Sequence, residues 1–551
     1  MDSDQQAVEI LAEQEQLAAA RSQLDQIREQ IALRILPNYA NQFVGQNRVS
    51  LTQGVQNTQE MVDATGALAL MTFASINESM LTPHGSKWHT LVPSDPQLLK
   101  DRETRLWFED LTTLVFKLRY APKANYASQK REDYTMLGAF GDGCIFTDAL
   151  KSAREVGFRY RAVHPGQIYF QDNHQGLIDK AFRRFPLTAR QAVQQFGEAL
   201  PEEIQQQAAD PRRNNTVHWF IHKTSPRADY DPGRRDIKGM PFASVYVSVT
   251  KKVTVRENGY HAFPYAISRY VTTPGEVHGR SPAMMALPAL KSLNEMKKTQ
   301  LKQGHRRVDP ILLTYDDGVA DHFSFKPGSL NSGAVTAEGK LLVHALPTGD
   351  LAAGKDAMEA EQRTINDFFL VNMFRILVDS PQKTATQVIE ESREKGALLT
   401  PHMGRQQSES LGPQIEREVD LLREMRLLRP MPPALLEARG AYTIQYDSPL
   451  SRLARAEEAS GLMRVVDWTK EIVAVTQDPT PLDHFDWDTI IPELCDSQAV
   501  PVRWRKRIAA IQAMREQRAQ QAEDRQLIEA APAASNVLKT LMPKPTAPVA
   551  A

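Results

Sequence analysis

Cysteine is almost absent from this sequence. The chain has 551 residues and two cysteines, Cys144 and Cys495. One distant pair cannot form a disulfide framework, and neither thiol stands in the C-x-x-C spacing of redox and zinc sites. We therefore expect two buried thiols in a protein that folds in a reducing cytoplasm.

Long apolar runs and a net charge are missing as well. No stretch approaches about 18 consecutive apolar residues, so we expect no membrane span, and the acidic, polar N-terminus lacks the features of a secretory signal. The 66 basic side chains nearly cancel the 67 acidic ones, which leaves a formal net charge of −1. This balance excludes a protein that coats nucleic acid by bulk charge, although it leaves local contact with DNA open.

The common phosphate-binding and metal-binding motifs are absent. The chain has no G-x-x-x-x-G-K-[ST] loop and therefore no P-loop for ATP. Gly138, Gly141 and Gly143 lie close together, and we interpret them as a tight helix-to-strand turn. The 13 histidines are scattered, with no H-E-x-x-H and no Cys/His cluster, so we interpret them as structural or solvent-exposed.

Two acidic pairs resemble the ligands of a two-metal nuclease, but each has a simpler interpretation. Asp316-Asp317 precedes Gly318, as is typical of a hairpin turn. Glu390-Glu391 falls on the solvated face of an expected helix. No serine stands in the G-x-S-x-G setting of a hydrolase. We therefore expect no cofactor, no metal ion and no catalytic residue.

The distribution of helix-forming and β-branched residues predicts an α+β body. Helices are expected at 5–36, 61–81, 98–120 and 126–140. Antiparallel strands, interrupted by a helix at 188–196, are expected at 144–147, 158–163, 167–170, 217–221, 243–249 and 252–256. The alternation of strand and helix that a doubly wound sheet requires is missing.

Two long helices that flank a strand-rich insert form the most distinctive unit. The first is expected at 282–307, with Ser281 as its N-cap, and the second at 354–377. Over 291–307 the first helix has six basic side chains against one acid, a net excess of about five positive charges. On spacing alone, a plain helical hairpin with a solvated basic face is the simpler interpretation.

The rest of the chain is predicted to be helical, with one strand and a Pro-rich end. A helix is expected at 384–429 and a strand at 442–446, and the sequence from 450 to 531 is typical of helices. The last residues, from 532, are rich in Pro and Ala, and we expect a mobile tail there.

Five segments, in this order along the chain, resemble those of a known family. They are Asp63-Ala64-Thr65-Gly66, Gly138-Ala139-Phe140-Gly141-Asp142-Gly143, His278-Gly279-Arg280-Ser281-Pro282, Thr384-Ala385-Thr386-Gln387-Val388 with the later Gly404-Arg405-Gln406-Gln407-Ser408-Glu409, and Tyr446-Asp447-Ser448-Pro449-Leu450. Through this ordered set, which spans most of the chain, the sequence resembles the bacteriophage portal proteins, the head-to-tail connectors of short-tailed phages.

The resemblance implies a mainly helical portal fold that assembles as a ring, usually of twelve subunits, at one vertex of a capsid. It divides the chain into a wing at 1–280, a first stem helix at 281–307, a strand-rich clip at 308–353, a second stem helix at 354–377, a tunnel loop with a long wing helix at 378–440, a helical crown at 441–531 and a flexible tail at 532–551.

The resemblance also implies a function and a set of partners. Double-stranded DNA would be packaged and ejected through the axial channel without recognition of its sequence. The partners would be the major capsid and scaffold proteins, a tail adaptor at the clip, and a terminase that supplies the ATPase this chain lacks. The protein would be assembled in the host bacterial cytoplasm and would belong to the virion, as a conduit rather than an enzyme.

The candidate DNA-channel residues are basic or amide side chains at the implied stem and constriction. In the stem they are Lys297, Lys298, Lys302, Arg306 and Arg307, and in the tunnel loop they are Gln382 and Lys383. A conduit must not hold its DNA tightly, and each neutralised phosphate adds affinity through released counterions. A nearly neutral chain with a few cations that face phosphates, not bases, therefore suits this role.

Two alternatives remain open at this point. The basic side chains of the first stem helix could instead pair with Asp356, Glu359 and Glu361 of neighbouring stems. The chain could also be something other than a portal protein: a DNA-processing enzyme, such as a metal-dependent nuclease or a recombinase, with an unrecognised site, or a scaffold or adaptor that merely packs helices.

Overall fold

The structure is a computed structural model, and we describe the following parts of the chain. They are residues 3–44, 58–99, 101–150, 156–313, 351–372, 401–447, 464–475, 485–497, 504–506 and 510–521, residue 480, and short stretches between 324 and 347. The chain divides into two compact units. The first comprises Met1–Trp88, Leu114–Leu428 and Tyr446–Leu450, and the second comprises His89–Thr113, Arg429–Gln445 and Ser451–Ala551.

The predicted N-terminal helix is two helices, α1 (Ser3–Ala20) and α2 (Ser22–Ile35), which are interrupted at Arg21. The prediction of one helix is wrong at this point because the two halves have different packing partners. α1 packs against a five-stranded sheet, whereas α2 packs against α3 (Thr65–Leu81) and α5 (Tyr126–Phe140). The guanidinium of Arg21 is buried at the break, 4.0 Å from the centroid of the Tyr169 ring.

Two antiparallel sheets form the strand-rich part of the first unit, which confirms the α+β class. The three-stranded sheet has the order β3-β2-β9 and the five-stranded sheet the order β4-β5-β6-β7-β8. Their strands are β2 (Asp142–Ala149), β3 (Phe158–Ala162), β4 (Ile168–Asp172), β5 (Ile178–Thr188), β6 (Val217–Pro226), β7 (Phe242–Ser248), β8 (Val253–Tyr260) and β9 (Tyr265–Arg269).

The sequence prediction missed strands β5 and β9. β5 carries four charged side chains and Pro186, which together hide its β pattern. β4 pairs with β5 only as far as Arg183, so β5 extends beyond the end of β4 at Pro186. Proline is tolerated there because no neighbouring strand on that side requires a hydrogen bond from its nitrogen. β9 has only five residues, all buried. The expected helix at 188–196 is α6 (Ala189–Phe196), capped by Thr188 and followed by α7 (Glu202–Ala209), which was not predicted.

The first long helix is confirmed with one break, as α8 (Pro282–Met285) and α9 (Leu287–Val308). Pro288 explains the break, because it has no N–H to bond to the carbonyl four residues earlier and its ring crowds that carbonyl. The second long helix, α10 (Leu351–Phe368), is shorter than predicted. It ends before Leu370, whose φ of 61° no α-helix can include. Residues 373–377 lie outside the described part of the chain.

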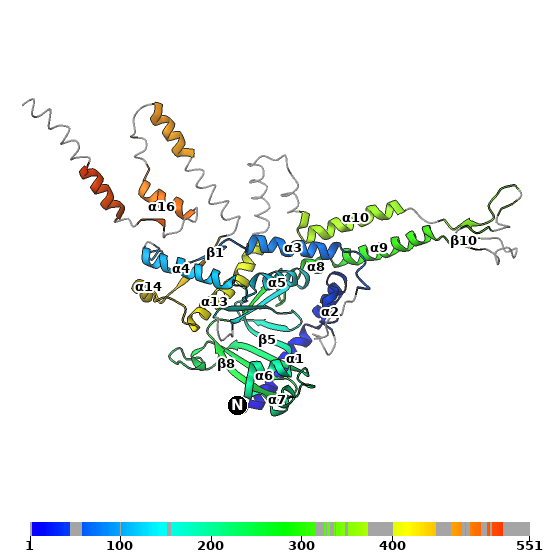
Figure 1. Cartoon of the computed structure of the whole chain (residues 1–551), viewed down its shortest axis with the longest axis horizontal. Coiled ribbons are helices and arrows are strands. Elements are labelled where there is room, and N and C mark those ends of the chain that lie inside the picture. The colour runs from blue at the N-terminus through cyan, green and yellow to red at the C-terminus, as the bar shows by residue number, and fades with distance from the viewer. Residues whose placement is uncertain are drawn as a thin grey trace, which may run out of the picture. The chain divides into compact units, whose positions relative to one another are not determined.

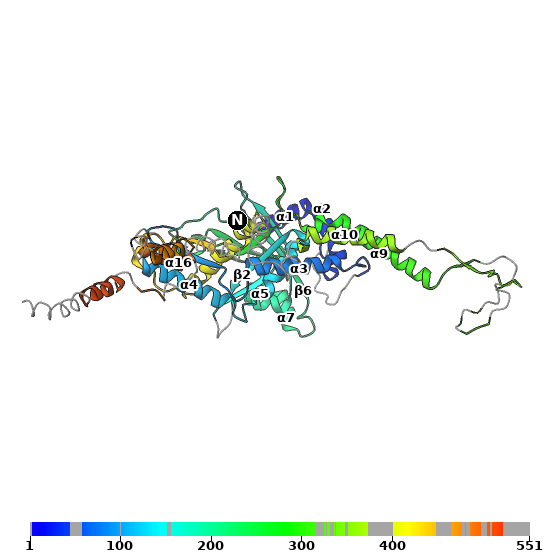
Figure 2. The ribbon, with the colours of Figure 1, turned by 90° about the horizontal axis from the view of Figure 1, so that it is seen from above.

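Helices α9 and α10 lie side by side and extend away from the rest of the first unit (Figures 1 and 2). At their near end, Leu290 and Leu293 of α9 and Met358 and Ile365 of α10 join the core that α2, α3 and α5 form. At their far end, β10 (Leu312–Leu313) pairs with β11 (His344–Ala345). The hairpin is therefore anchored at one end and capped by a small ribbon at the other.

The expected helix at 384–429 is seen over 401–424, as a π-helical turn at Gln407–Leu411 and α13 (Gly412–Glu424). In the second unit, β1 (His89–Pro93) pairs with β12 (Tyr442–Tyr446). Its helices include α14 (Pro433–Glu437), 464–475, α16 (Trp487–Ser497) and 510–521, and α4 (Arg102–Arg119) has residues in both units. The tunnel-loop residues 378–383 and the tail from 532 lie outside the described residues.

None of the helices in the described ranges is both long and apolar enough to cross a membrane. Of the two free thiols, Cys144 is buried as expected, whereas Cys495 is only partly buried.

Candidate nucleic-acid interface

The basic side chains of α9 lie on two different sides of the helix. Leu290 and Leu293 mark the buried side. Lys298, Lys302 and Arg306 follow one another at four-residue spacing, seven residues after Lys291. Lys291, Lys302 and Arg306 are exposed on the side away from the core, whereas Lys298 is half-buried at its edge, four residues after the buried Asn294. We call Lys291, Lys298, Lys302 and Arg306 the outer basic stripe.

Lys297 and Arg307 do not belong to the outer basic stripe. Lys297 comes four residues after Leu293, and Arg307 comes five full turns after the buried Ala289. Both therefore lie on the side of α9 that is buried in the N-terminal part of the helix. The five candidate stem residues therefore do not form a single surface within one chain.

One member of the stripe is paired and the others are not. Lys298 Nζ lies 3.0 Å from a carboxylate oxygen of Glu295 and 3.7 Å from one of Glu60, and the hydrogen bond to Glu295 raises the pKa of Lys298. In the described part of the chain no ion pair holds Lys302 or Arg306, and both are exposed. These two cations are free to contact an external anion.

The acids of α10 do not neutralise this basic surface within one chain. Glu359 lies 3.9 Å from Lys355 and 3.7 Å from Arg363, both on its own helix. Among the described residues no salt bridge joins α9 to α10. Pairing of α9 cations with Asp356, Glu359 or Glu361 of a neighbouring copy stays a prediction, and so do Gln382 and Lys383, which fall outside the described residues.

The base of the long helices is held by a buried carboxylate, Asp142, at the start of β2. Its oxygens accept hydrogen bonds from Arg28, from Nδ1 of His278 at 2.7 Å and from the backbone N–H of Gly279 at 2.7 Å. Burial alone would raise the pKa of Asp142, but the charges of Arg28 and His278 and these hydrogen bonds lower it to about 2. Asp142 is therefore a permanent anion that joins three segments.

Two glycines let the segments around Asp142 approach this closely. Gly141 has a φ of 85°, and a Cβ atom there would stand 2.1 Å from the carbonyl oxygen of Gly279. Gly141 ends α5 and β2 begins at the next residue, which confirms the predicted helix-to-strand turn. Any side chain at Gly141 would push the two backbone segments apart.

Ser281 fixes the direction in which α8 leaves this junction. Its hydroxyl accepts a hydrogen bond from the N–H of Met284 at 3.0 Å, as the N-cap prediction required, and donates to the carbonyl of Ala139 at 2.9 Å. Nearby, Arg269 pairs with Glu409 at 2.7 Å. The second and third resemblance segments thus meet residues 404–409 of the fourth at one place, although more than a hundred residues separate them.

Sequence reasoning singled out the glycines of this junction but missed Asp142 and Arg28. The only signal was the position of Asp142 between two glycines of a resemblance segment, because nothing in the local sequence of α2 marks Arg28 as its partner. The described residues also hold no group of three or more His, Cys, Asp or Glu side chains with the geometry of a metal site.

Comparisons with known proteins bear on the whole chain. A family model described as "Bacteriophage head to tail connecting protein" matches residues 7–504. The "Probable portal protein" of Bordetella phage BPP-1 is 28% identical over 477 residues, which cover 84% of this chain and 81% of that protein. The "Portal protein" of Salmonella phage epsilon15 is 27% identical over 500 residues, 88% of this chain and 87% of that protein. These similarities support the portal interpretation and not the DNA-processing alternative.

Proposed function

Because this chain belongs to the family of bacteriophage head-to-tail connecting proteins, we propose that its copies form a ring at a capsid vertex and that double-stranded DNA passes through the axial channel. The observation that carries this proposal is the family match over residues 7–504, together with two relatives that are named as portal proteins. Its role in the virion is then structural, as the family's role is.

The subdomains follow the sequence division, with the helix ends taken from the structure. The stem comprises α8, α9 and α10, and the clip is the segment between α9 and α10 with the β10–β11 ribbon. The wing comprises 1–280 with 378–440, the crown 441–531 and the tail 532–551. The anchored base of the α9–α10 hairpin supports this assignment, because a stem must transmit load to the body.

The outer basic stripe is the part of the stem that best suits contact with DNA phosphates. In a ring of identical subunits, every exposed cation of α9 is repeated in each copy and becomes a circle of charges around the channel. Lys302 and Arg306 lack ion-pair partners in the described part of the chain, whereas Lys298 is partly neutralised by Glu295. Few free charges per subunit keep the affinity for DNA low, since each neutralised phosphate strengthens binding. Contact would be to backbone phosphates, not bases.

Lys297 and Arg307 lie on another side of α9 from the outer basic stripe, so in the ring they would contact a different neighbouring surface. Gln382 and Lys383 would lie at the constriction of the channel. Twelve is the copy number that we propose. The further partners that we propose are the major capsid and scaffold proteins, a terminase that supplies ATP hydrolysis, and a tail adaptor at the clip. None of these contacts requires a cofactor or a catalytic residue in this chain.

Imaging of the purified full chain by negative-stain electron microscopy tests the central claim. We expect closed rings of about twelve subunits with a central hole. A monomer that cleaves DNA in the presence of Mg²⁺ would instead support the nuclease alternative, and so overturn the proposal.

Charge reversal tests the stem assignment. We expect Lys297→Glu with Lys298→Glu, and separately Lys302→Glu with Arg306→Glu, to leave ring assembly intact and to change the length or retention of packaged DNA. The matched control is Arg190→Glu with Arg212→Glu, two exposed cations of the wing near α6 and α7. If packaging by both stem variants equals that of the control, the stem residues do not line the channel.

A further inference from the structure

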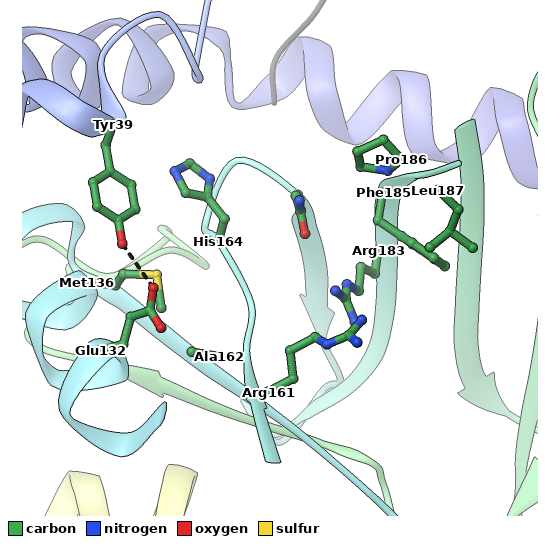
Figure 3. A pocket seen from close by; sticks show the side chains of 11 residues that line it. Tyr39, Glu132, Met136, Arg161, Ala162, His164, Arg183, Phe185, Pro186 and Leu187 are labelled. Carbon is green, nitrogen blue, oxygen red and sulfur yellow. Dashed lines mark hydrogen bonds between the residues drawn. The ribbon is translucent and has the colours of Figure 1, made fainter. Parts of the chain in front are cut away.

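A pocket lies between the two sheets of the first unit and is bordered on one side by α5 (Figure 3). Its volume is about 300 Å³. Arg161 enters it from β3, Arg183 and Phe185 from β5, Glu132 from α5, and His164 from the segment that joins β3 to β4. The proposed portal function makes no use of this pocket.

The two arginines of the pocket have like charges and no acidic partner. Arg183 is only 7% exposed, and its Nε atom is buried without a hydrogen-bond acceptor. Its guanidinium lies 4.9 Å from the centroid of the Phe185 ring and beside the hydroxyl of Tyr265, neither of which carries a negative charge. Among the described residues no carboxylate forms an ion pair with Arg161 or Arg183.

The cost of the missing partner falls on Arg183, because Arg183 is buried whereas Arg161 is exposed. Desolvation at the pocket lowers the pKa of Arg161, and the nearby charges of Arg183 and Arg159 lower it further. Elsewhere in this unit the buried cations are matched, as Arg28 is by Asp142 and Arg119 by Glu418. Arg183 departs from this pattern, because it is buried and its Nε atom has no acceptor, while the exposed guanidinium of Arg161 borders the same pocket. A buried cation without a counter-charge is costly, so its placement at a pocket beside a second cation points to an anion.

The remaining polar groups of the pocket define its character. Nδ1 of His164 accepts a hydrogen bond from the N–H of Gly166 at 2.9 Å, so the proton of the neutral ring is on Nε2, which is buried and has no partner. Burial lowers the pKa of His164 to about 3, so the ring stays neutral. Opposite the arginines, Glu132 accepts a hydrogen bond from the Tyr39 hydroxyl at 3.1 Å and repels a second negative group.

We propose that this pocket binds one oxyanion, a carboxylate or a phosphate group, between the guanidinium groups of Arg161 and Arg183. Planar guanidinium forks match both anions, with two parallel N–H···O bonds each. The volume allows a small group and not an extended chain. The anion can be free phosphate or the carboxylate of an acidic side chain, and the two sources share this recognition chemistry.

The test is titration calorimetry of the full-length protein with two probes, inorganic phosphate and N-acetylglutamate, at constant ionic strength in a chloride buffer. We expect saturable binding of at least one probe to one site per chain, with a millimolar or lower dissociation constant. Binding of phosphate alone identifies a free-phosphate site, and binding of N-acetylglutamate alone identifies a carboxylate site. If neither probe binds, the proposal is wrong.

Three variants separate a binding site from a structural one. Arg161→Gln and Arg183→Lys should each weaken probe binding at least tenfold, the second because it keeps the charge but loses the fork. Arg159→Gln, which removes the same charge two residues earlier on β3 from outside the pocket, should change binding less than twofold.

Thermal unfolding gives a readout that does not depend on the probe. Without anion, Arg161→Gln should melt at the same or a higher temperature than the wild type, because it removes a repulsion. With the bound probe, the order should reverse. A variant that melts lower in both conditions would show that Arg161 serves the fold, and would overturn the proposal.

Discussion

The charges at the base of α8 and those along α9 lie in opposite surroundings. Asp142 and Arg28 are 2% and 0% exposed, and each is held by several partners. Lys302 and Arg306 are exposed and have no ion pair in the described part of the chain. An unpaired charge costs several kcal/mol in the interior and almost nothing in water. Buried charges here therefore serve the fold, and exposed ones remain available to a ligand.

The largest effect is expected from removing the buried anion. Asp142→Ala removes the nearer counter-charge of the buried Arg28 and leaves it Asp25, which lies 3.6 Å away and also pairs with Arg21. We expect the variant to lower the free energy of unfolding by about 3–5 kcal/mol. Urea denaturation measures this loss. The control is Glu60→Gln, which removes the half-exposed partner of Lys298 and Arg34 and should cost less than about 0.5 kcal/mol. Equal losses in the two variants would contradict the comparison.

A second variant sharpens that result. Adding Arg28→Met to Asp142→Ala removes the stranded cation, so part of the lost stability should return. If the double variant is less stable than Asp142→Ala, the cation has partners that matter more than Asp142.

The interior should also respond to pH through a buried histidine. Burial lowers the pKa of His402 to about 4, and its Nε2 lies 2.9 Å from Asn77. The unfolded chain binds this proton near pH 6.5 and the folded chain does not, so stability present at pH 7 is lost as the pH falls toward 4. A shift of this size corresponds to about 3 kcal/mol.

His402→Gln tests this linkage, because glutamine can keep the hydrogen bond to Asn77 without titrating. Between pH 7 and pH 4, the free energy of unfolding should fall by about 3 kcal/mol less in the variant than in the wild type, as measured by denaturation. Asp142 does not interfere, since its pKa of about 2 means that its contribution is lost only as the pH falls from about 4 to 2. Parallel pH profiles for wild type and variant would show that His402 is not held neutral.

The close approach of two backbones at the junction should have an intermediate effect. Gly141→Ala combines an unfavourable φ of 85° with a clash against Gly279, whereas Gly85→Ala has a φ of 91° and nothing within 4 Å. The conformational strain alone costs about 1 kcal/mol. Because both variants share this strain, the clash should make Gly141→Ala less stable than Gly85→Ala by about 2 kcal/mol. Urea denaturation measures this difference in the free energy of unfolding. Similar losses would mean that the junction yields without cost.

The smallest effect on stability is expected on α9. Lys302→Gln should change the free energy of unfolding by less than about 0.5 kcal/mol, because an exposed unpaired cation contributes little beyond its interaction with the helix dipole. The same variant should reduce the salt dependence of DNA binding by about one unit of log–log slope per contact. Filter binding over a range of salt concentrations measures it, and an unchanged slope would show that Lys302 does not meet phosphate.

Much of the secondary structure could be predicted because its causes are local. The helix at 126–140 and the strand at 442–446 have the predicted ends, and Ser281 caps α8 as expected. β5 could not be predicted, because its charged residues do not give the apolar pattern of a strand. Only the tertiary contacts of the folded chain account for them. Of the candidate site, the sequence identified the α9 cations, and helical periodicity alone would have divided them between two sides.

The sequence by itself determined the elements, the charge balance and the family resemblance, since propensity, caps and ordered motifs depend on residues a few positions apart. Only the tertiary structure decided that Arg28 meets Asp142 across 114 residues, that the break at Arg21 separates two packing surfaces, and that Arg161 and Arg183 share a pocket. The reason is physical: such contacts exist only after the chain has closed long loops, and no local pattern specifies which distant residues will meet.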